Sequence, residues 1–111
     1  MAELHGNINL EVCTTCKRQH MRDFKVRTIK EDNHEHLTGR ICDTPGCGGQ
    51  LKDSDINFGE KLEDDILQQA FAMSTIADLY LCMGCSMRVS PANTLPQYTF
   101  MNGGRIVMMN L

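Results

Sequence analysis

The chain reads Cys13-Thr14-Thr15-Cys16 near its start and, after 25 further residues, Cys42-Asp43-Thr44-Pro45-Gly46-Cys47. Each pair of cysteines encloses a short, turn-forming spacer that aims both sulfur atoms at one point. Two such pairs can converge to hold one Zn²⁺ tetrahedrally through four thiolates. Because four cysteines leave no coordination position open, the sequence predicts a structural zinc site rather than a catalytic one. The predicted ligands are Cys13, Cys16, Cys42 and Cys47.

Other interpretations of the cysteines and histidines are weaker. Four buried free cysteines would need apolar surroundings, whereas these have polar neighbours such as Lys17. Cys82 and Cys85 form a further C-x2-C pair, but Cys82 lies inside an apolar run, where cysteine packs as a small hydrophobic residue. His34 and His36 lie in a polar stretch, so we expect them to be solvated rather than to replace a cysteine ligand.

Outward from the cysteines, the first half of the chain has the pattern of short strands and polar loops. Apolar and polar residues alternate over residues 8–12 and again over 24–28, which is the period of a half-buried strand. Residues 31–39 are polar and include Gly39, so they predict a loop.

From about residue 56 the pattern is that of an α/β structure. Apolar residues share one face of a predicted helix over 62–77, whose acidic first turn suits the helix dipole. The apolar runs 79–83 and 105–110 predict strands buried on both faces. A short helix is expected between them, ending at Gly103-Gly104. The fold class is therefore α/β, with a partial parallel sheet beside a small zinc-ribbon-like module.

Composition and charge exclude several functions. The net charge is −3, with 11 basic and 14 acidic residues and no dense Lys/Arg block, so no direct sequence-specific contact with nucleic acid is evident. The first nine residues hold no apolar signal-peptide core, and no run approaches the roughly 18 apolar residues of a membrane span. We expect an intracellular, unsecreted protein without membrane association, in a reducing compartment where cysteine clusters indicate metal binding.

Polar residues follow both predicted strands of the parallel sheet. Gly84, Cys85 and Ser86 come directly after the first strand, and Asn110 closes the second. In an open parallel sheet, ligands bind beyond the carboxyl ends of the strands. These residues therefore predict part of a ribose or base pocket.

Taken together, the motifs resemble those of the sirtuins. In chain order they are Leu4-His5-Gly6-Asn7, the two cysteine pairs, Phe58-Gly59-Glu60, Ala77-Asp78-Leu79, Gly84 to Ala92, and Gly103 to Asn110. The resemblance covers essentially all 111 residues, and residues 4–7 with Thr38-Gly39-Arg40 are most similar to the class IV branch. It implies a catalytic-histidine segment at 1–7, a zinc-binding module at 8–55, and the C-terminal part of an NAD-binding Rossmann domain at 56–111.

The resemblance assigns the substrate side of the site. His5 matches the catalytic histidine, a general base, and histidine suits proton transfer near neutral pH. The acyl-lysine peptide is expected to dock as an added strand between Phe58-Gly59-Glu60 and Val89, with Phe58 beside the lysine tunnel. Asn57 departs from the family pattern, which usually has an apolar residue there, and we expect this to alter the acyl pocket.

The same resemblance assigns the nucleotide side. Gly84, Cys85, Ser86 and Asn110 match residues that contact the adenosine part of NAD. Cys85 stands where the family usually has threonine or serine, so a thiol replaces the usual hydroxyl at that position.

The implied function is that of an NAD-dependent protein-lysine deacylase with structural Zn²⁺. Its partners would be acyl-lysine proteins, histones among them, its products nicotinamide and an acyl-ADP-ribose ester, and its location the nucleus. The alternative, from another class, is a non-enzymatic zinc-ribbon module that binds a protein partner. The second half of the chain weighs against that alternative, because a ribbon needs no pair of parallel strands.

One part of the sirtuin pattern is not encoded in these residues. The glycine-rich turn that cradles the NAD pyrophosphate at a helix N-terminus has no match among them. We therefore expect the chain to be a fragment or a truncated product, inactive and without tight NAD binding by itself.

Overall fold

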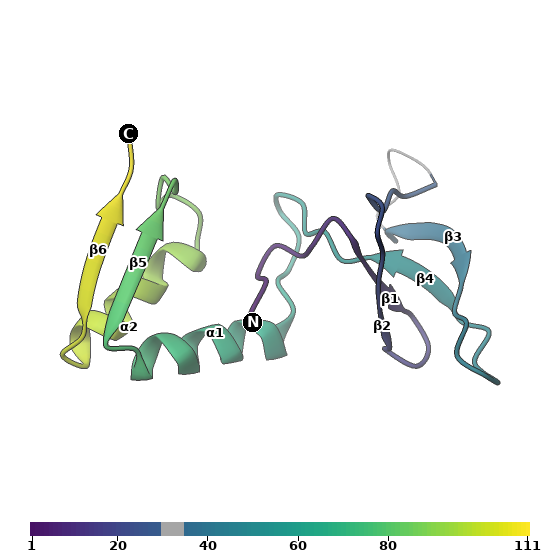
Figure 1. The fold of residues 1–111 in the computed structure, drawn as a ribbon, viewed down its shortest axis with the longest axis horizontal. Coiled ribbons are helices and arrows are strands. Elements are labelled where there is room, and N and C mark those ends of the chain that lie inside the picture. The colour runs from purple at the N-terminus through teal and green to yellow at the C-terminus, as the bar shows by residue number, and fades with distance from the viewer. Residues whose placement is uncertain (30–34) are drawn as a thin grey trace. The chain divides into compact units, whose positions relative to one another are not determined.

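The computed structural model describes residues 1–29 and 35–111, which form two compact units (Figure 1). One unit is His5–Lys61. The other combines Met1–Leu4 with Leu62–Leu111. None of the described helices has the length and apolarity needed to cross a membrane.

The unit His5–Lys61 is built on a four-stranded antiparallel sheet. Its strands are β1 (Leu10–Cys13), β2 (Gln19–Met21), β3 (Leu37–Ile41) and β4 (Gln50–Asp53), in the order β2-β1-β4-β3. The central strand β1 pairs Val12 with Gln19 on one side and with Lys52 on the other. Each strand has one end at or within three residues of a cysteine pair, so the sheet fixes where the sulfur atoms point.

Two sequence predictions for this unit need correction. The strand predicted over 24–28 does not form, although the Val26 N–H donates to the Ile8 carbonyl at 2.7 Å. Val26 alone is buried there. Phe24 is half exposed, and the Arg40 guanidinium lies over its ring, 5.2 Å from the ring centre. The alternation therefore reflects one buried side chain and not a strand paired to a neighbour. The loop predicted over 31–39 ends early, because β3 begins at Leu37; residues 30–34 lie outside the described residues.

The core of this unit is small and contains its cysteines. Cys13, Cys42 and Leu51 are buried together, with Cys47 packed against them. Leu51 is the large aliphatic side chain of this cluster, and it is 0% exposed. A core with so little aliphatic area supplies little hydrophobic stabilisation, so the unit needs a further cross-link.

The same unit contains a buried carboxylate, that of Glu11. Glu11 is 0% exposed and accepts hydrogen bonds from Arg22 Nε at 2.6 Å, Arg40 Nε at 2.7 Å and Thr38 Oγ1 at 2.6 Å. Burial alone would raise the pKa of Glu11, but these donors outweigh it and hold the pKa below its usual value. The carboxylate thus ties β1 to β3 and to the residue that follows β2.

The second unit has the predicted α/β pattern. It consists of α1 (Asp64–Ile76), β5 (Leu79–Met83), η1 (Ala92–Thr94), α2 (Leu95–Met101) and β6 (Arg105–Met109), and β5 pairs with β6 in parallel. The helices are joined by a hydrogen bond from Thr99 Oγ1 to the Ser74 carbonyl at 2.6 Å, and Phe71 packs edge-on against Tyr98 at 4.9 Å.

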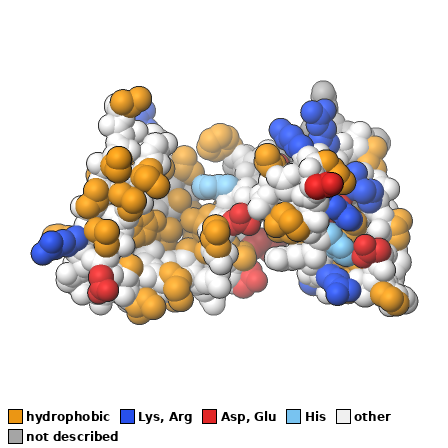
Figure 2. Space-filling model, viewed as in Figure 1, with side chains coloured by type: hydrophobic (Ala, Val, Ile, Leu, Met, Phe, Trp, Pro, Cys, Tyr) orange, Lys and Arg blue, Asp and Glu red, His pale blue; other side chains and the backbone are white. Residues whose placement is uncertain are grey.

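The prediction that both strands are buried on both faces is wrong for this structure. All five side chains of β6 are exposed, and in β5 only Cys82 is buried. Hydrophobic side chains therefore gather on the surface of this unit (Figure 2). Two strands covered partly by α2 cannot enclose both of their own faces, so an apolar run identifies the strand but not what covers it.

Candidate functional site

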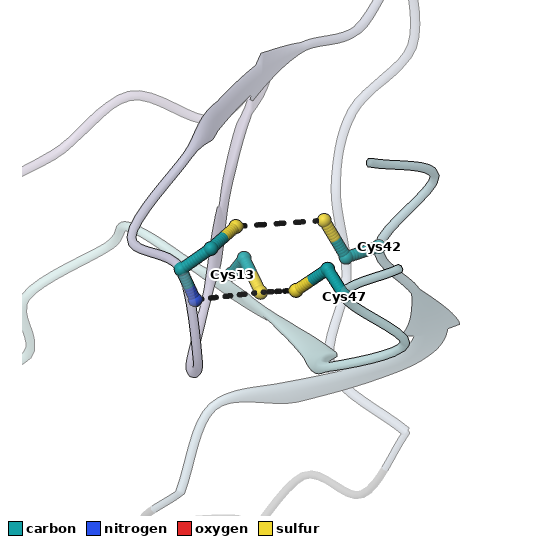
Figure 3. A group of neighbouring side chains, drawn as sticks. Cys13, Cys42 and Cys47 are labelled. Carbon is teal, nitrogen blue, oxygen red and sulfur yellow. Dashed lines mark hydrogen bonds between the residues drawn. The ribbon is translucent and has the colours of Figure 1, made fainter. Parts of the chain in front are cut away.

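The four predicted zinc ligands converge in the structure. All four sulfur atoms lie within 4.8 Å of one another, with Cys13 Sγ 3.6 Å from Cys47 Sγ and Cys16 Sγ 3.8 Å from Cys42 Sγ. Figure 3 shows the Cys13 and Cys47 side chains pointing toward each other. A tetrahedral Zn²⁺ with sulfur at about 2.3 Å separates its ligand atoms by about 3.8 Å. The donor set therefore fits Zn²⁺ in both chemistry and spacing.

Local backbone structure holds each pair. Cys13 ends β1, and the N–H groups of Thr15 and Cys16 both donate to Cys13 Sγ at 3.4 Å. The second pair is closed by the Cys42 N–H, which donates to the Gly49 carbonyl at 2.8 Å. A Cβ at Gly49 would crowd Cys13 Sγ at 2.8 Å, so glycine is required where the two loops meet.

The four sulfur atoms compete for negative charge. The Cys16 N–H, followed by that of Thr15, lowers the pKa of Cys13 to about 6. The N–H of Gly49 favours the Cys47 thiolate, but the neighbouring thiols, Cys16 first, outweigh it and raise the pKa of Cys47 to about 11. Four thiolates this close require a cation, which is what Zn²⁺ supplies when it displaces the protons.

The segment around His5 is fastened to the end of the zinc module. The Ile56 N–H donates to the His5 carbonyl at 3.2 Å, the Asn7 N–H donates to Ser54 Oγ at 3.0 Å, and Ser54 Oγ donates to the Asn7 carbonyl at 3.1 Å. Gly6 lies between these bonds with φ +82°, and a Cβ there would overlap the Ser54 carbonyl oxygen. The His5 side chain itself is exposed.

Gly6→Ala is expected to destabilise the unit His5–Lys61 by about 2 kcal/mol or more, since a left-handed φ costs about 1–2 kcal/mol for a residue with a Cβ and the overlap with Ser54 adds to it. Chemical denaturation of the zinc-loaded 111-residue chain measures the change. Gly59→Ala is the matched control for backbone strain alone, because Gly59 also has positive φ, has open space around a Cβ and lies outside both cysteine loops. Equal losses for the two variants would contradict the packing argument.

The predicted peptide-docking residues Phe58, Gly59 and Glu60 lie in a turn of residues 57–60, directly after Ile56. We call it the docking turn. The Glu60 N–H donates to the Asn57 carbonyl at 3.1 Å, and Glu60 Oε2 accepts the Asn57 N–H at 2.7 Å. Gly59 takes φ +89°, and Phe58 is 93% exposed. The Asn57 N–H, with His36, lowers the pKa of Glu60 to about 2. The turn thus presents an aromatic side chain to the outside on a closed backbone.

The predicted nucleotide-side residues lie at one edge of the second unit. The Gly84 N–H donates to the Met109 carbonyl at 3.0 Å, which brings the residue after β5 beside the residue before Asn110. Gly84 has φ +57°, and Cys85, Ser86 and Asn110 are exposed. The parallel pairing of β5 and β6 therefore places the segments after both strands at the same edge. Val89 is likewise exposed in the loop that follows.

Comparison with known proteins decides the family, because residues 1–91 match the model of the Sir2 family. The chain belongs to the Sir2 family. It is 37% identical over 111 residues to the NAD-dependent protein deacetylase SRT1 of Oryza sativa subsp. indica, covering 100% of this chain and 22% of that protein. It is 43% identical over 94 residues to the NAD-dependent protein deacetylase sirtuin-7 of Bos taurus, covering 80% of this chain and 23% of that protein.

A solved structure of a Sir2 protein bound to an acetylated peptide shares the fold. The TM-score is 0.63 at 31% identity, and the match covers 99% of this chain and 43% of that one. The Sir2-family chain described here thus spans less than half the length of the relatives it matches.

Within this Sir2-family chain, sequence reasoning missed two histidine contacts. His20 is buried, with Nε2 3.4 Å from Cys42 Sγ and Nδ1 3.3 Å from Asp43 Oδ1. His36 is not solvated as predicted: its side chain is 14% exposed and lies between Asp53 and Glu60. His34 lies outside the described residues. No strand was predicted at 19–21, so no signal in the sequence indicated that His20 is buried there between the exposed residues Gln19 and Met21.

Proposed function

We propose that the protein containing this chain is an NAD-dependent protein-lysine deacylase with a structural zinc site. The observation that carries the proposal is the fastening of His5, through Gly6 and Ser54, to the strand end from which the Phe58 turn emerges. A base and an exposed docking turn are thereby held in one unit, in a chain of a family whose relatives include named deacetylases.

The proposed roles follow the chemistry of each group. His5 would accept a proton from a ribose hydroxyl of the co-substrate, which then attacks the activated acyl group. The acyl-lysine peptide would add as a strand between the turn Phe58-Gly59-Glu60 and Val89. In this reaction the acyl oxygen would first displace nicotinamide from C1′ of the ribose. After attack by the ribose hydroxyl, addition of water would release the lysine without its acyl group and leave that group as an acyl-ADP-ribose ester.

The nucleotide side is proposed from the edge of the second unit. Gly84, Cys85, Ser86 and Asn110 would contact the adenosine part of NAD, with residues 56–111 contributing to the NAD-binding domain. The exposed backbone around Gly84 allows close approach of a ligand. Cys85 offers a thiol where a hydroxyl is usual, which would weaken one polar contact.

Two further points complete the proposal, one from the relatives and one from the cysteine cluster. Similarity to sirtuin-7 and the residues 4–7 support a place in the class IV branch, and with it a nuclear location and histones among the acyl-lysine substrates. The zinc site is proposed to be purely structural, since its four sulfur atoms fill a tetrahedral shell and leave none for water.

The test is product analysis with the complete protein, an acetylated histone-tail peptide and NAD. Deacetylated peptide, nicotinamide and acetyl-ADP-ribose are expected in equal amounts, detected by mass spectrometry, with none formed when NAD is omitted. The 111 residues alone are expected to give no product, because the glycine-rich turn expected to hold the NAD pyrophosphate has no match among them. Peptide that stays acetylated with the complete protein would overturn the proposal.

A further inference from the structure

His36 lies between two carboxylates. Its Nδ1 is 2.8 Å from Asp53 Oδ1 at the end of β4, and its Nε2 is 3.0 Å from Glu60 Oε1 in the docking turn. A neutral imidazole carries one N–H, so it can satisfy one of these contacts and would set a lone pair against the other oxygen. The imidazolium donates to both. The geometry therefore fits a protonated His36 that bridges the two carboxylates.

The backbone holds the ring in this position. His36 has φ +58°, a left-handed conformation uncommon for a residue with a side chain. Its carbonyl accepts the Asp53 N–H at 2.9 Å, and the next residue, Leu37, pairs with Lys52 in the sheet. His36 is thus attached to β4 through its backbone and its ring at once, which is the arrangement of a fixed anchor rather than a surface side chain.

Glu60 connects His36 to the docking turn. One oxygen receives His36, and the other accepts the Asn57 N–H at 2.7 Å, the bond that closes the turn carrying Phe58. If His36 releases Glu60, the carboxylate loses its attachment to the sheet, and its bond to the Asn57 N–H then opens more readily. The orientation of Phe58 relative to β4 would then no longer be fixed.

We propose that His36 is a positioning residue for the acyl-lysine substrate. As a cation, the His36 side chain joins the docking turn, through Glu60, to Asp53 of the zinc module. The inference rests on the proposed function for its substrate and deepens it by naming what orders the docking turn. His36 touches neither substrate nor reacting atoms. Its effect should therefore appear in peptide binding rather than in turnover.

The bridge depends on the charge of His36 and so on pH. Burial alone would lower the pKa of His36, but the bonds to Glu60 and Asp53 outweigh it and raise the pKa above its usual 6.5. Because the folded-state pKa is raised, the bridge is fully present at low pH and is lost as pH rises through the raised value. The other charged groups facing the site are Asp55, Lys25 and Arg27.

Protons and water reach these groups through an open pocket. A cavity of about 510 Å³ is lined by His36, Asp53, Asp55 and Asn57 and by residues 26–29. Burial, followed by the charge of Asp53, raises the pKa of Asp55. The bridge can therefore respond to bulk pH without unfolding of the sheet.

Two measurements test the proposal, each on His36→Gln, whose amide can donate to one carboxylate and does not titrate. In the complete protein, the KM for the acetylated peptide should rise about 5–10-fold at pH about 6.5 with kcat and the KM for NAD little changed. The wild-type peptide KM should climb toward the variant's as pH rises, while the variant's stays flat. Met21→Ala, at an exposed site of the same unit, is the control. A fall in kcat with unchanged peptide KM, or identical pH profiles, would overturn the positioning role.

The second measurement is amide hydrogen exchange in the zinc-loaded 111-residue chain, which needs no enzymatic activity. The Asn57 amide should be more protected in the wild type than in His36→Gln at low pH, and equally protected at high pH. Equal protection at every pH would show that no bridge exists. An inactive wild-type enzyme would overturn the deacylase assignment and the substrate role of His36 together, while exchange would still decide whether the bridge forms.

Discussion

Removal of zinc will unfold the sheet β1–β4. The free energy of unfolding should fall by on the order of 10 kcal/mol, the scale on which structural zinc stabilises small modules. The expectation follows from the core, where Cys13, Cys42 and Leu51 are buried together, and where Leu51 is the one large aliphatic side chain of the cluster among the described residues. Without Zn²⁺, four thiols with opposing pKa shifts would remain in van der Waals contact. Titration with a strong chelator, followed by circular dichroism and metal analysis, measures the transition.

Cysteine variants separate the metal from general thiol chemistry. Cys16→Ser should abolish zinc binding with unfolding of the unit, because three thiolates and a hydroxyl bind Zn²⁺ far more weakly than four thiolates. Cys85→Ser is the matched control, an exposed cysteine of the other unit, and should keep one zinc per chain. Freshly purified protein without zinc, or zinc retained when Cys13 and Cys47 are both replaced by serine, would refute the assignment.

The zinc cluster could be predicted from sequence because its geometry is local. Each pair is aimed by its own turn, so the spacing of Cys13 to Cys16 and of Cys42 to Cys47 carries the information. The helix α1 and the strands β5 and β6 were predictable for the same reason, since their patterns repeat over neighbouring residues. The prediction of a strand over residues 24–28 failed because only one side chain of the alternating pattern, Val26, is buried.

Contacts between distant residues were not predictable from one sequence. The bridge from His36 to Asp53 and Glu60 joins residues that lie 17 and 24 positions apart, and no spacing rule connects them. The buried Glu11 likewise looked like the solvent side of a strand, because its partners Arg22 and Arg40 come from other parts of the chain. The polar stretch around His36 predicted solvent exposure for the segment as a whole. That composition cannot show that one histidine of the segment is paired with distant carboxylates.

His5→Ala in the complete protein is expected to lower kcat about 10²-fold, the usual scale for loss of a general base. The expectation rests on the position of His5, which is exposed yet held through its backbone to Ile56 directly before the docking turn. Fixing the backbone orients a side chain without burying it, so the imidazole remains free to meet a substrate. The peptide KM should change little, because the residues proposed to dock the peptide, Phe58 and Val89, are unchanged in this variant.

Chemical rescue distinguishes a base from a structural residue. Free imidazole added to His5→Ala should restore part of the turnover, since a small base can enter the space that the side chain leaves, whereas a variant damaged in folding would gain nothing. Steady-state kinetics with and without imidazole, alongside zinc content and thermal unfolding, make the comparison. Gly6→Ala is the useful contrast, because it disturbs the same segment through the backbone and should be insensitive to imidazole. Near-normal turnover of His5→Ala would return His5 to the status of a surface histidine and leave the deprotonation step to another group.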